Sequence, residues 1–466
     1  MVMSTEKSAV LWSAIEKCAT YVVNFSIQII LARLLCPEDY GVVAMLAVFL
    51  AVSQAFVDSG FATVLIQKQD CTIQDYTSVF YFNIIVSGVC YAVLFLSASY
   101  IERFYKFDGL ALVTRVYFLN LIINSVAMVH RVILMKSLDF KKIALINLVS
   151  SIVSAITAVV MAYLNFRYWA IICQSLLSSL INTLFTMYLS HWHPLGRFNM
   201  ESLRRMAPLG VKIMFASQFH AVYNNIYSLL IGKKYSPIDL GFYDRGKTLA
   251  STGAVGFSDF YIRALYPIQS KIQGDKGHLL NSYNKSFDFI CLCIIPFSAF
   301  ISSYSMETVS VIYGDGWQAS ANMLSILSIG FMFYPFQALN MNILKVVGNG
   351  DYLLYSEIIK KTIGIIIVII MINFNLELVV IGWTVSAIVE FIISLFFLNK
   401  VLKGNLTYVV SSFFKSIIFS FSVMITSYWI FRQVCENMYV RLLLGMACIF
   451  ICFLLNINKL KKLLGK

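Results

Sequence analysis

Charged residues are scarce in this chain of 466 residues: Asp, Glu, Lys and Arg make up 13% of it, whereas a soluble domain of ordinary composition carries about 25%. Apolar residues make up 59%, whereas a soluble domain has about 45–50%. This balance excludes a water-soluble globule. Since a membrane-spanning helix needs about 20 apolar residues, we expect a chain that lies almost wholly in a membrane.

The sequence also lacks the short motifs of common enzymes. Its five histidines include no HExxH pair, and no GxSxG or GxxxxGK[ST] string occurs. The sequence therefore has no metal-binding motif of a metalloprotease, no nucleophile motif of a serine hydrolase and no phosphate-binding loop of a P-loop ATPase. The ten cysteines form no CxxC pair, and most lie in apolar runs, where a thiol behaves as a small hydrophobic group. The sequence thus predicts no metal, no cofactor and no catalytic residue.

Hydropathy predicts an all-α integral membrane protein with 14 transmembrane helices. One of the apolar runs, 241–266, is much less apolar than the others because it contains several charged residues, and it must face water or protein. The predicted spans are 9–35, 40–66, 78–100, 110–135, 143–164, 167–189, 207–232, 241–266, 284–305, 319–344, 354–372, 376–399, 409–431 and 438–457.

The loop charges predict the orientation of these spans. With the N-terminus inside, the loops on the cytoplasmic side hold the large majority of the loop lysines and arginines. Because cytoplasmic loops carry the excess of basic residues, both termini are expected in the cytoplasm. The same loops account for most of the net charge of +13, so no nucleic-acid partner is needed to explain it.

An internal repeat has a spacing of 200 residues. Residues 32–41 read ARLLCPEDYG and residues 232–241 read GKKYSPIDLG, with Pro, Asp and Gly at matching positions. In each copy Pro and Gly separate two helices, and Asp can cap the new N-terminus. The repeat predicts two related six-helix halves.

Polar residues line the first helix of each half at helical spacing. In the first half they are Glu16, Thr20, Asn24 and Gln28, and in the second half Lys212, His220, Asn224 and Ser228. We expect these stripes to face each other across a central cavity, although hydrogen bonding between packed helices is an alternative for the asparagines. The predicted organisation is an N-terminal lobe (1–190), a cytoplasmic linker (191–206), a C-terminal lobe (207–400), and two appended helices with a basic tail (401–466).

A series of sequence motifs carries a family resemblance. After Trp12 and Ser13, the motifs in chain order are LARLLCPEDYG, VDSGFATVLIQKQ, LMKSLDFKK, YWAI, YGDGW and VVGNGDYLL. This series resembles the polysaccharide transporters of the multidrug/oligosaccharidyl-lipid/polysaccharide (MOP) superfamily, above all the Wzx-type O-antigen flippases and colanic acid exporters.

The resemblance implies both a fold and a function. The fold would be MATE-like, with two pseudo-symmetric lobes around a V-shaped cationic lumen. The function would be alternating-access transport of an undecaprenyl-diphosphate-linked oligosaccharide, a repeat unit of O-antigen, capsule or exopolysaccharide, across the bacterial cytoplasmic (inner) membrane. Its implied partners are membrane lipids, a polysaccharide polymerase and a chain-length regulator.

Charged residues inside the predicted spans are the candidate site residues. Arginine binds phosphate with paired donors and lysine supplies a point charge, so we expect these cations to line the lumen: Arg33, Lys212, Arg245, Lys247, Arg263 and Arg131. The acidic residues either pair with these cations or carry a coupling proton or sodium ion. They are Asp58, Asp244, Asp259 and Glu16.

Two other functions remain open at this point. A MATE-like drug/cation antiporter would favour acids in its site, whereas this chain has more intramembrane bases than acids. A membrane-embedded polysaccharide polymerase or ligase would need a large external loop, and every predicted loop is short. A purely structural scaffold would hardly carry so many charges within its spans.

Overall fold

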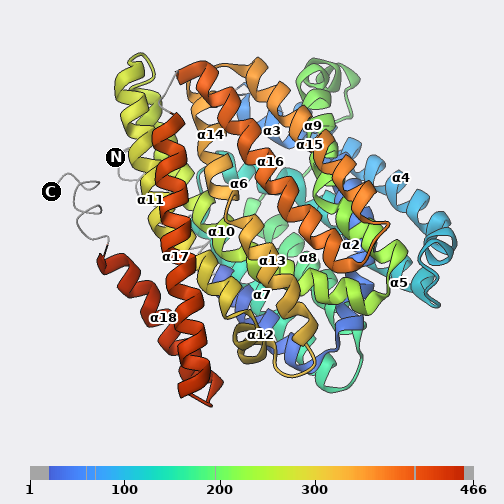
Figure 1. Ribbon diagram of the computed structural model, residues 1–466. Helices are drawn as coiled ribbons and strands as arrows, with labels where there is room; N and C mark the ends of the chain where they lie inside the picture. Colours follow the sequence, from blue (N-terminus) through green and yellow to red (C-terminus); the bar gives the residue numbers. More distant parts are fainter. Residues whose placement is uncertain (1–19, 59, 69, 195, 403–405, 456–466) are drawn as a thin grey trace. The chain divides into compact units, whose positions relative to one another are not determined.

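The computed structural model describes residues 20–455 except 59, 69, 195 and 403–405, and every regular element in this part of the chain is a helix (Figure 1). The described helices fall into two compact units, Met1–Gly241 and Phe242–Lys466. This all-α architecture is the one that the sequence predicts.

The first unit contains the helix Thr20–Leu34 and eight further helices. They are α2 (Pro37–Asp58), α3 (Phe61–Gln67), α4 (Ile73–Tyr105), α5 (Leu110–Tyr117), α6 (Leu119–Lys136), α7 (Phe140–Tyr163), α8 (Tyr168–Ser190) and α9 (Met200–Lys234). Within this unit α9 packs along α2 and also contacts α3 and α4.

The second unit begins within α10 (Pro237–Lys271) and continues through eight helices to the C-terminus. These are α11 (Lys276–Ser303), α12 (Ser305–Tyr313), α13 (Gln318–Phe331), α14 (Tyr334–Val346), α15 (Gly350–Met371), α16 (Leu376–Leu402), α17 (Leu406–Val434) and α18 (Met438–Leu455).

Each predicted span coincides with one helix or with two consecutive helices; the start of the first span, with Glu16, lies outside the described residues. Among the described residues, nine helices are long and apolar enough to cross a membrane. The long helices α9 and α10 are not among them. They are more polar, and they carry most of the candidate site residues of the second predicted lobe.

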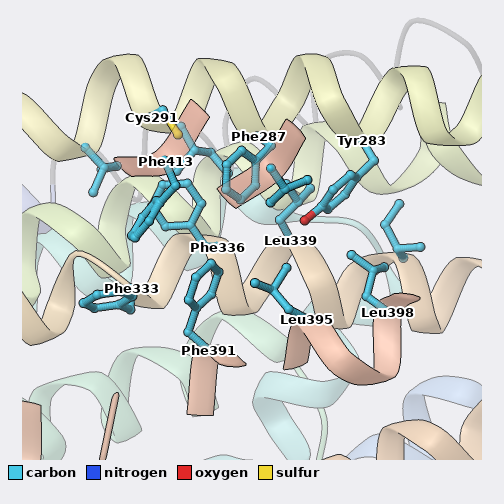
Figure 2. Packing of buried hydrophobic residues seen from close by; sticks show 14 of the residues in the cluster. Tyr283, Phe287, Cys291, Phe333, Phe336, Leu339, Phe391, Leu395, Leu398 and Phe413 are labelled. Atoms are coloured by element: carbon cyan, nitrogen blue, oxygen red, sulfur yellow. The ribbon is translucent and has the colours of Figure 1, made fainter. Parts of the chain in front are cut away.

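A cluster of aromatic rings forms the core of the second unit (Figure 2). Phe287 of α11 contacts Phe336 of α14 with a centroid distance of 4.8 Å, and Phe336 contacts Phe413 of α17 at 5.2 Å. Phe391 of α16 packs on Phe413 at 5.3 Å. Aromatic pairs at such distances stabilise a core beyond the area that they bury. The cluster therefore holds α17 on the same packed block as α11, α14 and α16.

Part of the predicted linker between the lobes is helical. Helix α9 begins at Met200, so the second half of the predicted linker 191–206 is helical. Asn199 caps this helix, since its side chain accepts a hydrogen bond of 2.8 Å from the backbone N–H of Glu201. The division into compact units falls later, after Gly241, because α9 packs with helices of the first unit. The lobe boundaries themselves stay a prediction based on the repeat.

Candidate substrate-binding site

The two copies of the repeat form the same local structure. The Asp39 carboxylate accepts a hydrogen bond of 3.1 Å from the backbone N–H of Cys36, at the start of α2. The Asp239 carboxylate accepts one of 3.2 Å from the N–H of Ser236, at the start of α10. The predicted capping role of both aspartates is confirmed. The repeat is thus present in the structure as well as in the sequence.

The first copy also fixes the start of α8. Asp39 accepts a hydrogen bond of 3.1 Å from the N–H of Tyr168, and Arg167 Nε lies 3.3 Å from its carboxylate. Arg167 also pairs with Glu38 at 2.5 Å. Hydrogen bonds to the Cys36 sulfur and to Glu38 raise the pKa of Arg167 further above its usual value. A cavity of about 310 Å³ lies beside this ion pair.

The polar stripe of the first helix is present on the described residues. Asn24 is exposed, and Thr20 and Gln28 are half-buried. The Thr20 hydroxyl has no hydrogen-bond partner in the part of the chain that the structure describes. Arg33 is exposed near the end of the same helix. Exposed polar groups on a membrane helix require water or polar partners.

The corresponding stripe lies on α9. Lys212, His220 and Asn224 are all exposed, and the His220 Nε2 atom lies 2.8 Å from the Asn224 side-chain nitrogen. Ser228, the last member of the stripe, is buried. Lys212 makes no ion pair with another described residue.

Helix α10 separates its candidate residues into two groups. Near its start, Arg245 is mostly buried and pairs with its neighbour Asp244 at 2.7 Å, and Lys247 lies 5.8 Å from the centre of the Tyr243 ring. More than three helical turns further along, Asp259 and Arg263 are exposed. Within the described chain Arg263 makes no ion pair.

A polar network in the first unit joins Asp58 and Arg131, for which the sequence predicts separate roles. The Arg131 guanidinium donates a hydrogen bond of 2.6 Å to Asn182, and Asn182 donates one of 2.8 Å to Asn147. Gln54 donates one of 2.9 Å to Asp58, and Arg131 interacts electrostatically with Asp58. The three amides are not among the candidates that the sequence indicates, because their only signal is their polarity within apolar runs.

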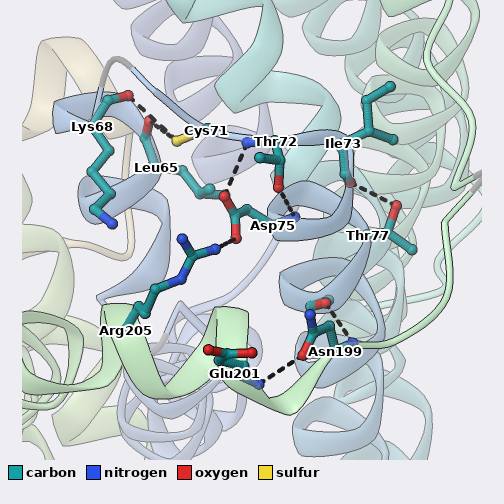
Figure 3. A network of polar contacts seen from close by, with 11 residues as sticks. Leu65, Lys68, Cys71, Thr72, Ile73, Asp75, Thr77, Asn199, Glu201 and Arg205 are labelled. Carbon is teal, nitrogen blue, oxygen red and sulfur yellow. Dashed lines mark hydrogen bonds and ion pairs between the residues drawn. The ribbon is translucent and has the colours of Figure 1, made fainter.

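A second network ties the start of α9 to the start of α4 (Figure 3). Asp75 and Thr72 form a reciprocal capping box, with hydrogen bonds of 2.9 and 3.2 Å. Arg205 of α9 donates a hydrogen bond of 3.0 Å to the same Asp75 carboxylate. The connection between the predicted lobes is thus anchored by an ion pair as well as by packing.

The fold is shared with solved membrane transporters. The lipid II flippase MurJ, in an inward closed conformation, has a TM-score of 0.74 over 97% of this chain and 100% of its own chain, at 12% identity. An inward-facing MATE family multidrug resistance transporter of the MOP superfamily has a TM-score of 0.63 over 82% of this chain and 95% of its own, at 15% identity. The chain is a multi-pass membrane protein with the fold of the MOP superfamily.

Residues 30–322 match the family described as polysaccharide biosynthesis protein, and the chain belongs to this family. The teichuronic acid biosynthesis protein TuaB of Bacillus subtilis (strain 168) is 22% identical over 80% of this chain and 77% of its own length. The succinoglycan biosynthesis transport protein ExoT of Rhizobium meliloti (strain 1021) is 20% identical over 75% and 71%. The lipopolysaccharide biosynthesis protein WzxC of Escherichia coli (strain K12) is 21% identical over 68% and 65%. The family resemblance drawn from the motifs is confirmed.

Proposed function

We propose that this protein is a flippase, not an enzyme, and that it moves an undecaprenyl-diphosphate-linked oligosaccharide from the inner to the outer leaflet of a bacterial cytoplasmic membrane. The family, the transport function in the name of ExoT and the fold shared with a lipid II flippase support this function. The observation that carries the proposal is the exposure of Lys212 on α9 and of Arg263 on α10, in two helices predicted to lie within the membrane.

The energetics of these two cations favour a water-filled lumen. A charged side chain against lipid costs at least about 2.5–3.5 kcal/mol. An exposed Lys212 or Arg263 therefore faces water, and a wet cationic surface lowers the barrier for a diphosphate group. The polyprenyl tail of the substrate does not have to leave the lipid. Arg33 and Lys247 extend the same lumen in this proposal, and the Asn24 and Asn224 stripes supply its uncharged polar lining.

The acidic residues of α10 have different proposed roles. Asp244 neutralises Arg245, to which it is paired, so this cation contributes less to the lumen than Lys212. Asp259 is exposed one helical turn from Arg263 and is the candidate for a coupling proton or sodium ion.

In this proposal the six-helix lobes are 1–190 and 207–400, and both termini are cytoplasmic. A polysaccharide polymerase and a chain-length regulator act on the exported product.

Complementation of a deletion strain tests this function. We expect Lys212→Ala and Arg263→Ala each to abolish surface polysaccharide, with lipid-linked repeat units accumulating on the cytoplasmic face. The matched control is Lys234→Ala, which removes an exposed lysine from the end of α9 and is expected to leave export unchanged. The amount of each variant in the membrane fraction is measured by immunoblotting.

Three outcomes would count against the proposal. Normal surface polysaccharide in both variants would contradict the cationic lumen. Drug sensitivity of the deletion strain with intact polysaccharide would favour a MATE-like drug/cation antiporter. Accumulation of lipid-linked repeat units on the outer face would favour a polymerase or ligase, because that step follows export.

A further inference from the structure

The amide network of the first unit gathers side chains from four helices at one end of the bundle. Gln54 and Asp58 lie in the last turns of α2, Arg131 lies near the end of α6, Asn182 near the end of α8, and Asn147 near the start of α7. Helices α2, α6 and α8 run in one direction and α7 in the other in the predicted topology. All five side chains thus share one end, which the loop charges predict to be cytoplasmic.

These side chains are not sealed inside the unit. Asp58 and Arg131 are exposed, and the three amides are half-buried. All five lie within helices that are long and apolar enough to cross a membrane. Because an exposed charge in such a helix is costly against lipid, this face of α2, α6 and α8 must contact water.

One acceptor of the network has no hydrogen-bond partner among the described residues. The Gln54 amide nitrogen donates to Asp58, whereas its carbonyl oxygen Oε1 is buried and has no hydrogen-bond partner in the described part of the chain. A buried acceptor without a partner costs about 1–3 kcal/mol. A ligand hydroxyl would satisfy it.

The chemistry of the five groups identifies the ligand class. Asp58 and the amide oxygens are acceptors, and Arg131 and the amide nitrogens are donors. Such alternation suits a sugar, whose hydroxyl groups both donate and accept. It suits a diphosphate less well, because a diphosphate only accepts and would be repelled by Asp58. We infer that Gln54, Asp58, Arg131, Asn147 and Asn182 form a subsite for the glycan part of the substrate, separate from the lysine and arginine residues proposed for the diphosphate.

This inference rests on the proposed function, and it changes two of the roles expected from the sequence. Arg131 becomes a sugar ligand rather than a phosphate ligand. Asp58 becomes a sugar ligand rather than a coupling-ion site. The position near the predicted cytoplasmic end would let the subsite bind the glycan before the diphosphate enters the lumen.

Two soluble probes separate a glycan subsite from a diphosphate site. One is the oligosaccharide released by mild acid from the lipid-linked intermediates of the host strain, and the other is inorganic diphosphate. Each is titrated into the full-length protein in lipid nanodiscs. We expect Asn182→Ala to weaken oligosaccharide binding about tenfold, the loss of one to two hydrogen bonds, and to leave diphosphate binding unchanged. Lys212→Ala should weaken diphosphate binding and leave oligosaccharide binding unchanged.

A second variant guards against a purely structural effect. Asn182 also connects α6 to α7, so its loss can loosen helix packing. Gln54→Ala removes an amide whose hydrogen bond to Asp58 lies within α2, and it should weaken oligosaccharide binding without lowering the thermal midpoint. Asn373→Ala, at an exposed residue just after α15, is the control and should bind both probes like the wild type.

The result that overturns the inference differs from the result that overturns the proposed function. Wild-type protein without oligosaccharide binding would overturn the glycan subsite, and so would unchanged oligosaccharide binding in both Asn182→Ala and Gln54→Ala. An equal loss of both probes would overturn it as well. The proposed function is judged separately, by surface polysaccharide in the deletion strain, and can stand when the subsite fails.

Discussion

The α-carbon of Gly41 lies directly against the backbone carbonyl of Pro237. A methyl group added at Gly41 would stand 1.7 Å from the Pro237 oxygen, and a methyl group at Gly241 would stand 1.9 Å from the Pro37 oxygen. The two copies of the repeat therefore contact each other reciprocally, glycine of one against proline of the other. Only glycine permits this approach, which explains why both copies carry it four residues after proline.

Alanine at either glycine is expected to destabilise the protein. Relief of the overlap must move the backbone of the opposite turn, and overpacking of this kind costs about 1–3 kcal/mol. Because the contact is reciprocal, Gly41→Ala and Gly241→Ala should lower the thermal midpoint of the purified protein by similar amounts. The matched control is Gly88→Ala in α4, where an added methyl group meets no atom within 4 Å. It should leave the midpoint unchanged or raise it, and a Gly41→Ala variant as stable as this control would refute the contact.

The sequence predicts much of the fold because a membrane leaves few alternatives. Apolar runs of about 20 residues must form helices, since only hydrogen-bonded backbone is tolerated in lipid. The break between α5 and α6 at Phe118 was not predicted, because no proline or glycine marks it. The contact of Gly41 with Pro237 was also missed. The repeat predicts each turn separately, but contact between segments so far apart in sequence depends on tertiary packing.

The candidate site is less predictable than the fold. Charges such as Lys212 and Arg263 stand out in an apolar run, and the structure leaves both exposed. Pairing with a cation is one of the two roles expected for Asp244, and it is confirmed. That the partner is the adjacent Arg245 could not be inferred, because adjacent residues on a helix do not usually face each other. Asn147 and Asn182 resemble ordinary interhelical hydrogen-bonding residues in sequence. Only their arrangement around Arg131 distinguishes them.

The repeat offers a comparison between two aspartates with different environments. Asp39 is 2% exposed and accepts hydrogen bonds from α8 as well as from its own turn, whereas Asp239 is half-buried and accepts from Ser236. Asp239→Ala should cost about 1 kcal/mol, as for a lost helix cap. Asp39→Ala should cost about 1.5–3 kcal/mol more, because it also loses charge-assisted hydrogen bonds to α8. Thermal unfolding of both variants checks this order, and equal losses would contradict it.

The pair of Asp39 with Arg167 should resist alkaline conditions. The pKa of Arg167 is raised in the folded protein. The ion pair therefore contributes its full stability at any pH below the pKa of Arg167 in the unfolded chain, and this contribution is lost only as the pH rises through the pKa of Arg167 in the folded protein. Arginine is already protonated at every mildly alkaline pH in the unfolded chain, and the folded protein raises its pKa further. The difference in thermal midpoint between wild type and Arg167→Ala should therefore stay constant as the pH rises from neutral to mildly alkaline values. A difference that shrinks over this range would contradict the pairing.

A buried carboxylate holds the first of the two appended helices. Asp288 of α11 is 6% exposed and accepts hydrogen bonds of 2.5 Å from both Tyr408 and Ser412 of α17. Asp288→Ala should cost about 2–5 kcal/mol, since it leaves the buried Ser412 hydroxyl without this acceptor and also loses the hydrogen bond from Tyr408. Replacing all three residues by apolar ones (Asp288→Leu, Tyr408→Phe and Ser412→Ala) should recover most of this loss. Thermal unfolding of the single and triple variants measures both effects, and additive losses would refute the shared site.

The ion pair between Asp75 and Arg205 should contribute little and depend on salt. The Arg205 side chain is 53% exposed, whereas that of Asp75 is 5% exposed. Exposed pairs contribute about 0.2–1 kcal/mol, and 1 M salt shortens the screening length to about 3 Å. Arg205→Ala should therefore lower the thermal midpoint slightly at low salt and hardly at all in 1 M NaCl.

Asp75→Ala should be more damaging than Arg205→Ala at every salt concentration. It removes the carboxylate that accepts from the Thr72 N–H, one of the two reciprocal hydrogen bonds that cap α4 (Figure 3), and a helix cap contributes about 0.5–2 kcal/mol. These short-range bonds are screened much less than a surface ion pair. Arg204→Ala, one residue from Arg205 and exposed, is the matched control and should have no effect. If Arg205→Ala proved as costly as Asp75→Ala in 1 M NaCl, the guanidinium rather than the cap would anchor α9, and the connection between the predicted lobes would depend on charge.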